Sequence, residues 1–176
     1  VALVHFGRSG TGLLHSLIDG HPEVSTLPSY YFSEFFNPSN WEKIVAGGWS
    51  EMADRFIAAY EVLFDASVRN SIITKSKKAI YYMGQKEGMA NVGDKRDEVL
   101  RVDKALFREE LNCLMSVHNH LDAFAFFQLV HSAYDKSLND VNHKHLNFYH
   151  IHNPSPYAQL NFVHVAPNTN WVMMVR

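Results

Sequence analysis

The amino-terminal stretch 1–22 constrains this chain more than any other, because an apolar run leads through a glycine-rich turn into a second apolar run of helical spacing. Residues 1–6 are short, apolar and typical of a buried strand. The turn Gly7-Arg8-Ser9-Gly10-Thr11-Gly12 holds three glycines in six residues. Aliphatic residues at 13, 14, 17 and 18 then predict a helix from about Thr11 to Gly20. A strand, a glycine turn and a helix in this order favour binding of an anion at the turn.

Helices and strands alternate along the rest of the sequence. The pattern predicts strands at 24–27, 146–152 and 168–176, helices at 41–70, 104–133 and 155–165, and loops at 28–40, 76–97 and 135–145. Strands separated by helices predict an α/β fold of three layers, with a mainly parallel sheet flanked by helices. The glycine turn would then lie at the carboxyl ends of the strands, where such sheets bind ligands.

Charge and composition exclude several classes of protein. The net charge of −2 over 176 residues gives no broad basic field, so we expect no nucleic-acid partner and only a local anion site. Cys113, the single cysteine, excludes an intramolecular disulfide and a cysteine-rich zinc site. Because no apolar run approaches the ~20 residues that span a bilayer, we expect no membrane segment in this chain.

The glycine turn differs from the nucleotide-binding pattern G-x-x-x-x-G-K-[ST] at its last two positions. Gly7 and Gly12 match the two glycines, whereas Leu13 and Leu14 replace the lysine and the hydroxyl residue that holds Mg²⁺. An ATPase or GTPase without both groups lacks the means to bind the metal and neutralise the terminal phosphates. The turn therefore suits a similar anion that is handled without magnesium.

The residues of the turn also carry a family resemblance. Gly7 to Leu14, followed by Leu17, Asp19 and His21-Pro22, resembles the 5′-phosphosulfate loop of the sulfotransferases that use 3′-phosphoadenosine 5′-phosphosulfate (PAPS). In that family a strand precedes [R/K]-S-G-T-[T/S/G] and a leucine-rich helix that ends near His-Pro. Gly12 stands where many members carry Thr or Ser, which removes a hydroxyl but keeps the backbone donor. The stretch 171–176 resembles a second family strand, V-x-x-V-R, whose arginine binds the 3′-phosphate.

The resemblance implies a P-loop nucleotide-binding-like fold and a sulfotransferase-like domain over residues 1–176. It implies PAPS as co-substrate, no metal, and in-line transfer of a sulfuryl group to a hydroxyl or amine of a small-molecule or carbohydrate acceptor. Arg8 would act in catalysis by neutralising the leaving side. The residues it implies for PAPS are Arg8, Ser9, Gly10, Thr11, Gly12, Leu13 and Arg176.

The general base is open between a carboxylate and a histidine. Glu34 is the one acid in the aromatic loop that follows the second strand, and we expect the aromatic rings to desolvate it and raise its pKa. His150 and His152 compete with it, and we expect them on opposite faces of their strand, with one reaching the cleft. The aromatic segment 30–36 suggests an apolar or ring-bearing acceptor.

Other functions stay open beside the sulfotransferase. A small-molecule kinase or another P-loop nucleotide-binding protein is the first alternative, and a non-catalytic remnant domain is the second. Eleven histidines suggest a metal, but the pairs His118/His120 and His143/His145 have a spacing that chelates only from an extended segment. Because the sequence starts inside a strand and stops at Arg176, we expect a longer parent chain and a domain incomplete at its carboxyl end. For a bacterial chain we expect the cytoplasm.

Overall fold

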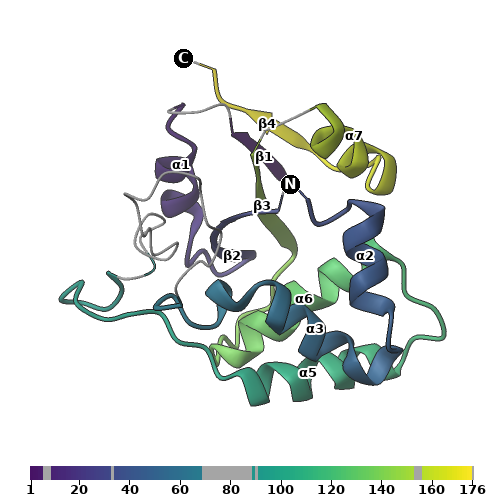
Figure 1. Ribbon diagram of the computed structural model, residues 1–176. Coiled ribbons are helices and arrows are strands. Elements are labelled where there is room, and N and C mark those ends of the chain that lie inside the picture. Colours follow the sequence, from purple (N-terminus) through teal and green to yellow (C-terminus); the bar gives the residue numbers. More distant parts are fainter. Residues whose placement is uncertain (6–8, 33, 69–88, 90, 153–155, 176) are drawn as a thin grey trace, which may run out of the picture.

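Four parallel strands form the sheet at the centre of the computed structural model, which describes residues 1–5, 9–32, 34–68, 89, 91–152 and 156–175 (Figure 1). The strands are β1 (Ala2–His5), β2 (Val24–Tyr31), β3 (Leu146–His152) and β4 (Trp171–Met173). Their order is β2-β3-β1-β4, and every pairing is parallel. The apolar run at the amino terminus is thus an inner strand, and Ala2, Leu3 and Val4 are fully buried.

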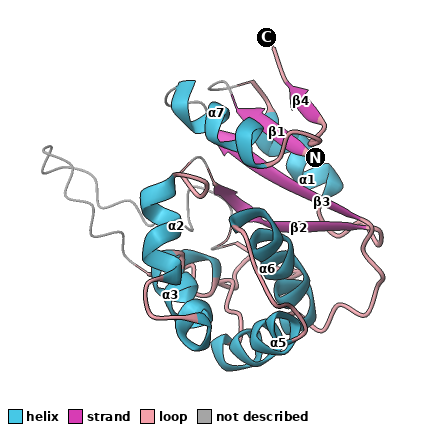
Figure 2. Cartoon of the chain, turned by 90° about the vertical axis from the view of Figure 1, so that its right-hand side faces the viewer, coloured by secondary structure: helices cyan, strands magenta, loops and turns pink. Residues whose placement is uncertain are grey.

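Helices cover both faces of the sheet (Figures 1 and 2). On one face lies α1 (Thr11–Ile18), whose His15 ring contacts Phe148 and His150 of β3. On the other face lie α6 (Ala123–Ser137) and α7 (Pro156–Val165), whose Phe127 and Phe162 contact Tyr149. Since successive residues of a strand point to opposite faces, these contacts define a helix–sheet–helix arrangement. The α/β class with a parallel sheet flanked by helices is confirmed.

A second group of helices packs beyond α6 and joins the same core. It contains α2 (Pro38–Val45), α3 (Met52–Ala59) and α5 (Lys104–Ser116), with 3₁₀ turns at Trp49–Glu51 and Glu61–Leu63. One contiguous cluster of buried side chains runs from Ala2 of β1 through Phe127 to Phe107 of α5. In it the buried Tyr134 hydroxyl donates a hydrogen bond to the Leu63 carbonyl at 2.5 Å.

The structure breaks both long predicted helices. The one expected at 41–70 starts earlier, at Pro38, and is interrupted at Gly47-Gly48, where Gly48 has a φ of 85°. The one expected at 104–133 ends at Ser116 and restarts at Ala123, after Asp122 has accepted a hydrogen bond from the Ala125 N–H at 2.7 Å. In both cases residues that end one helix or cap the next lie within an apolar pattern that is otherwise continuous.

The second strand is longer than the predicted 24–27, because β2 continues through Pro28 to Tyr31. Its register against β3 shifts between Thr26 and Tyr31, so the proline lies in an irregular stretch of an edge strand. Edge strands and bulges are the places in a sheet that tolerate the missing N–H of proline. In the described part of the chain, no helix has the length and apolar character needed to cross a bilayer.

Candidate functional site

The carboxyl ends of the four strands meet at one edge of the sheet, and each leads into a segment that the sequence singled out. The turn containing Ser9 follows β1, Glu34 follows β2, His152 ends β3, and Arg176 follows β4. The chain leaves β1 through α1 toward β2 and leaves the neighbouring β3 through α7 toward β4, in the opposite direction. Such a point of reversal creates a crevice at the carboxyl ends, where open α/β sheets bind ligands.

The end of the glycine turn has the backbone of an anion site. Gly10 precedes α1 with φ 86° and ψ 9°, a left-handed conformation that favours glycine. The Leu14 N–H donates to the Gly10 carbonyl at 3.1 Å and closes the first turn of α1. The N–H groups before Leu14 start the helix and have no acceptor within it. Because the first turn of α1 carries no acidic residue, the positive end of the helix dipole is not compensated there.

The turn and the carboxyl-terminal strand lie side by side. A Cβ added at Gly10 would stand 3.6 Å from the Met174 Cε atom, and β4 pairs with β1 over Ala2–Val4. The two segments that carry the family resemblance, far apart in the sequence, are therefore neighbours in the fold. Arg8 and Arg176 themselves lie outside the described residues.

The remaining side chains of the turn differ in exposure. The Ser9 Oγ atom is buried and has no hydrogen-bond partner among the described residues. Thr11 is 1% exposed, so its side chain lies in the interior rather than in solvent. Gly12 is exposed with open space where a Cβ would stand, and Leu13 is 68% exposed. A ligand above the turn would therefore meet the backbone at Gly12, with the Ser9 hydroxyl beneath the surface and available only if the turn shifts.

The prediction that aromatic rings surround Glu34 and desolvate it is wrong. Glu34 is exposed, and its Oε2 atom accepts a hydrogen bond from Asn37 Nδ2 at 3.2 Å. The neighbouring rings of Phe32, Phe35 and Phe36 are at most 3% exposed, because they pack inward against α6 and α7. These three rings belong to the core and leave the carboxylate in water. They do not line an acceptor pocket, and the side chains of Tyr30 and Tyr31 lie outside the described residues.

The histidines of β3 do not divide between two faces. Positions 150 and 152 are two apart on the strand and share a face, because side chains alternate with a period of two. His150 is 2% exposed and its ring meets that of His15 edge-on at 4.5 Å, so it packs beneath α1. The side chain of His152 lies outside the described residues.

Buried His15 ties α1 to the second strand. Its Nε2–H donates to the Leu27 carbonyl at 3.1 Å, and burial lowers its pKa below the ordinary 6.5. The neutral imidazole thus holds the first helix, and with it the glycine turn, at a fixed height on the sheet.

A buried polar network that the sequence pattern did not predict lies between α6 and β2. His131 Nδ1 lies 3.0 Å from the Ser25 Oγ, and Ser25 also acts on the nearby Asp135 carboxylate, whose pKa it lowers. Burial lowers the pKa of His131 to about 3 and raises that of Asp135 to about 6. The sequence carried no clear signal for it, because Asp135 falls in the loop predicted at 135–145, whereas α6 continues to Ser137 and places His131 and Asp135 four residues apart on one helix. Because Ser25 and His131 are sealed from solvent, the network holds α6 on the sheet and is not a nucleophilic triad.

Two further features delimit the site. The described residues contain no cluster of three His, Cys, Asp or Glu side chains that could hold a metal ion. Neither His118/His120 nor His143/His145 is part of such a cluster. A cavity of about 610 Å³ opens between α6 and β3 at the amino ends of the strands, across the sheet from the glycine turn.

Comparison of the chain with protein-family models, curated proteins and solved structures finds no significant match in any of the three.

Proposed function

We propose that this chain is a PAPS-dependent sulfotransferase domain with a P-loop nucleotide-binding-like fold. The observation that carries the proposal is the proximity of Gly10 and Met174, whose Cε atom is 3.6 Å from the position that a Cβ at Gly10 would take. The turn that resembles the phosphosulfate loop and the strand of V-x-x-V-R type are therefore neighbours at one edge of the sheet. The strand order supports it, since β1 and β3 form the point of reversal at which such sheets bind ligands.

The turn supplies the groups that a phosphosulfate needs. The backbone N–H groups from Ser9 to Leu13 start α1 and would donate to the 5′-phosphate and sulfate oxygens, aided by the helix dipole. The buried Ser9 hydroxyl has no other partner among the described residues and would donate as well. Arg8 would neutralise the leaving phosphate, and Arg176 would bind the 3′-phosphate. Gly12 is followed by neither a lysine nor a magnesium ligand. The turn is therefore better suited to the sulfate of PAPS than to a metal-bound triphosphate.

The reaction is an in-line displacement at sulfur. The acceptor oxygen or nitrogen forms a bond to sulfur while the bond from sulfur to the phosphate oxygen breaks, and 3′,5′-ADP leaves with the electron pair. The acceptor proton passes to a base at the carboxyl edge, for which Glu34 and His152 are the candidates. Glu34 is in water, so it suits this role only if the bound acceptor covers it.

Nucleotide binding separates the proposed function from its alternatives. We expect 3′,5′-ADP to raise the unfolding temperature without Mg²⁺, because ligand binding to the folded state stabilises it. Arg8→Ala and Arg176→Ala should weaken this binding about tenfold or more, the usual cost of losing a charged hydrogen bond. Arg108→Ala is the matched control, since Arg108 is paired with Asp54 on the helices beyond α6.

Two outcomes would overturn the proposal. Stabilisation by Mg·ATP alone would identify a kinase or another P-loop nucleotide-binding protein. Failure of both nucleotides would identify a non-catalytic domain. If 3′,5′-ADP binds, transfer of labelled sulfate from PAPS to a panel of alcohols and amines then tests catalysis.

A further inference from the structure

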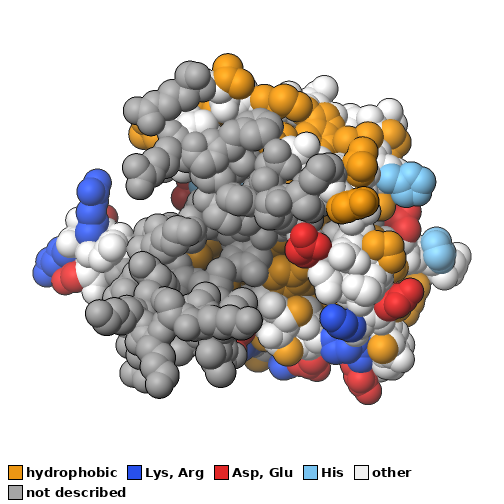
Figure 3. All heavy atoms as spheres, turned by 45° about the horizontal axis from the view of Figure 1, so that its top comes forward, with side chains coloured by type: hydrophobic (Ala, Val, Ile, Leu, Met, Phe, Trp, Pro, Cys, Tyr) orange, Lys and Arg blue, Asp and Glu red, His pale blue; other side chains and the backbone are white. Residues whose placement is uncertain are grey.

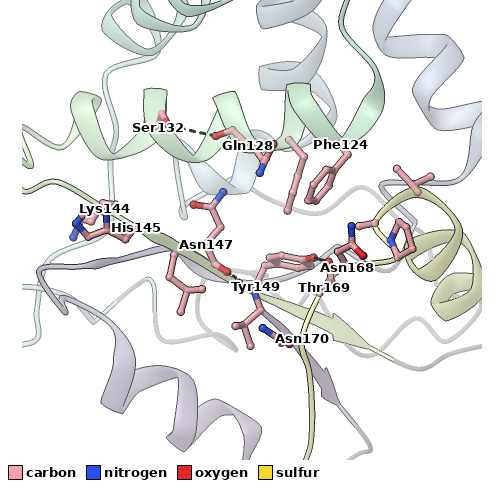
Figure 4. Close-up of a pocket in the computed structure, with 16 residues that line it drawn as sticks. Phe124, Gln128, Ser132, Lys144, His145, Asn147, Tyr149, Asn168, Thr169 and Asn170 are labelled. Carbon is pink, nitrogen blue, oxygen red and sulfur yellow. Dashed lines mark hydrogen bonds between the residues drawn. The ribbon is translucent and has the colours of Figure 1, made fainter.

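The structure has a second concave site, distant from the glycine turn. The cavity of about 610 Å³ lies between α6 and the amino-terminal half of β3, with the residues before β4 closing one side (Figure 4). Its volume is within the range of about 300–1,000 Å³ that is typical of small-molecule sites. We propose that this cavity binds a neutral carbohydrate. The inference does not rest on the proposed sulfotransferase function, because the two sites use different residues at opposite ends of the strands.

One stripe of α6 forms the roof of the cavity. Phe124, Gln128 and Ser132 are spaced by four residues and therefore lie on one face of the helix, which faces the strand (Figure 4). Below them Asn147 points up from β3, and the Tyr149 hydroxyl lies 3.4 Å from the Thr169 hydroxyl. The cavity thus combines an apolar ring at one end with amides and hydroxyls along its length.

The polar groups suit a ligand that both donates and accepts hydrogen bonds. The side-chain amides of Gln128, Asn147 and Asn168 line the cavity, and none has a hydrogen-bond partner among the described residues. Each amide carries two donor hydrogens and an accepting oxygen, which is the complement of a row of hydroxyl groups. The Phe124 ring adds an apolar wall of the kind on which the C–H face of a sugar ring packs.

The charge of the cavity favours a neutral sugar over an acidic one. No carboxylate is among the described residues that line it. The basic groups in its lining are His145, the Val1 ammonium, which donates to the Asn147 carbonyl at 2.6 Å, and Lys144. Lys144 is paired with Asp140 at 2.7 Å and donates to the His21 carbonyl at 2.9 Å. A cation already neutralised and held by two oxygens gives little gain to an anionic ligand. Hydroxyl-rich, uncharged ligands therefore match this lining best.

Exposed apolar side chains also lie on α7 and β4. Tyr157, Leu160 and Met173 are more than half exposed, and apolar side chains gather on the face that Figure 3 turns toward the reader. Nothing in the structure shows what covers them, so they carry no assignment.

Side-chain amide signals in ¹⁵N NMR spectra test the proposal on the whole chain. Maltose, lactose and cellobiose at millimolar concentrations are the probes. We expect at least one of them to shift the NH₂ signals of Gln128 and Asn147 along a saturable curve. Gln128→Leu should weaken that binding about tenfold, the cost of losing its hydrogen bonds to the ligand. Asn119→Leu, an exposed amide in the loop between α5 and α6, should leave it unchanged.

Three results would overturn the assignment. They are the absence of saturable shifts with all three disaccharides, equal affinity in Gln128→Leu and the parent, and tighter binding of glucose 6-phosphate than of any neutral sugar. Ser132→Val, on the same stripe of α6, provides a second variant in case Gln128→Leu does not fold. Titration with 3′,5′-ADP in the same spectra keeps this test distinct from that of the proposed function.

Discussion

At the scale of single residues, two glycines of the turn have opposite requirements. Gly10 adopts a φ of 86°, which costs residues with a Cβ energy, although the space beside it is not crowded. Gly12 lies within α1 with nothing within 4 Å of a Cβ, and its φ is not among the positive values. Gly10 is thus required by its left-handed backbone conformation, whereas a residue with a Cβ fits at Gly12 without strain.

We therefore predict a stability change of opposite sign for two identical substitutions. Gly10→Ala should lower the free energy of unfolding by roughly 1–2 kcal/mol, because alanine resists the left-handed conformation. Gly12→Ala should raise it by up to about 1 kcal/mol, because alanine loses less backbone entropy in a helix. Urea denaturation measures both. Equal destabilisation by the two variants would show that the conformation of Gly10 is not the reason for its presence.

At the scale of elements, the sequence predicted best where an apolar run had a clear period and a clear end. The helix after the glycine turn, the strand at 146–152 and the helix ending at Val165 all lie where their patterns place them. The predictions that failed concern features that depend on tertiary packing. The apolar stripe of 104–133 continues through residues 117–122, and only the capping side chain of Asp122 marks the restart.

The candidate site follows the same division. Four segments at one sheet edge follow from parallel strands, which the alternation of elements predicts. The exposure of Glu34 could not be predicted in this way, because it depends on the packing of Phe35 and Phe36 into α6 and α7. A run of aromatic residues does not tell which way its side chains point. The proximity of Gly10 and Met174 depends on β4 pairing with β1, a non-local choice that no local pattern encodes.

The caps of α5 and α6 give a prediction at this scale. Asp103 accepts hydrogen bonds from the N–H groups of Ala105 and Leu106, and Asp122 accepts one from Ala125. Asp103→Ala and Asp122→Ala should each cost about 1 kcal/mol of unfolding free energy, because a helix N–H loses its acceptor. Asp97→Ala, at an exposed loop position, is the control. Thermal or urea unfolding distinguishes them, and a cost no larger than that of the control would argue against capping.

At the scale of the whole molecule, the sheet separates two sites and the buried network joins its layers. The glycine turn lies at the carboxyl ends of the strands and the cavity at their amino ends. Ser25 of β2 and His131 of α6 connect the sheet to the helices through a hydrogen bond at 3.0 Å. Because this contact involves groups that titrate, the stability of the entire fold is linked to pH.

The two titratable groups of the network act in opposite directions. His131 has a pKa of about 3 in the folded state against an ordinary 6.5, so the unfolded chain takes up a proton first and stability falls as the pH drops below about 6.5. Asp135 has a pKa of about 6 against an ordinary 3.8, so the folded protein takes up a proton first and stability rises as the pH drops through about 6. Between about pH 6 and pH 4 each state gains one proton, and the two effects offset one another.

Asp135→Asn removes one side of this balance. Between pH 6 and pH 4 the variant should lose stability faster than the parent, with His131 contributing up to about 1.4 kcal/mol per pH unit. The charged groups that act on Asp135, namely Asp19, Asp140 and Lys144, are present in both proteins, so the difference between the two curves reports the change at position 135. Urea denaturation at several pH values gives those curves, and Asp97→Asn should follow the parent. Parallel curves for Asp135→Asn and the parent would show that the carboxylate does not compensate the buried histidine, and the pH dependence contributed by this network would then come from His131 alone.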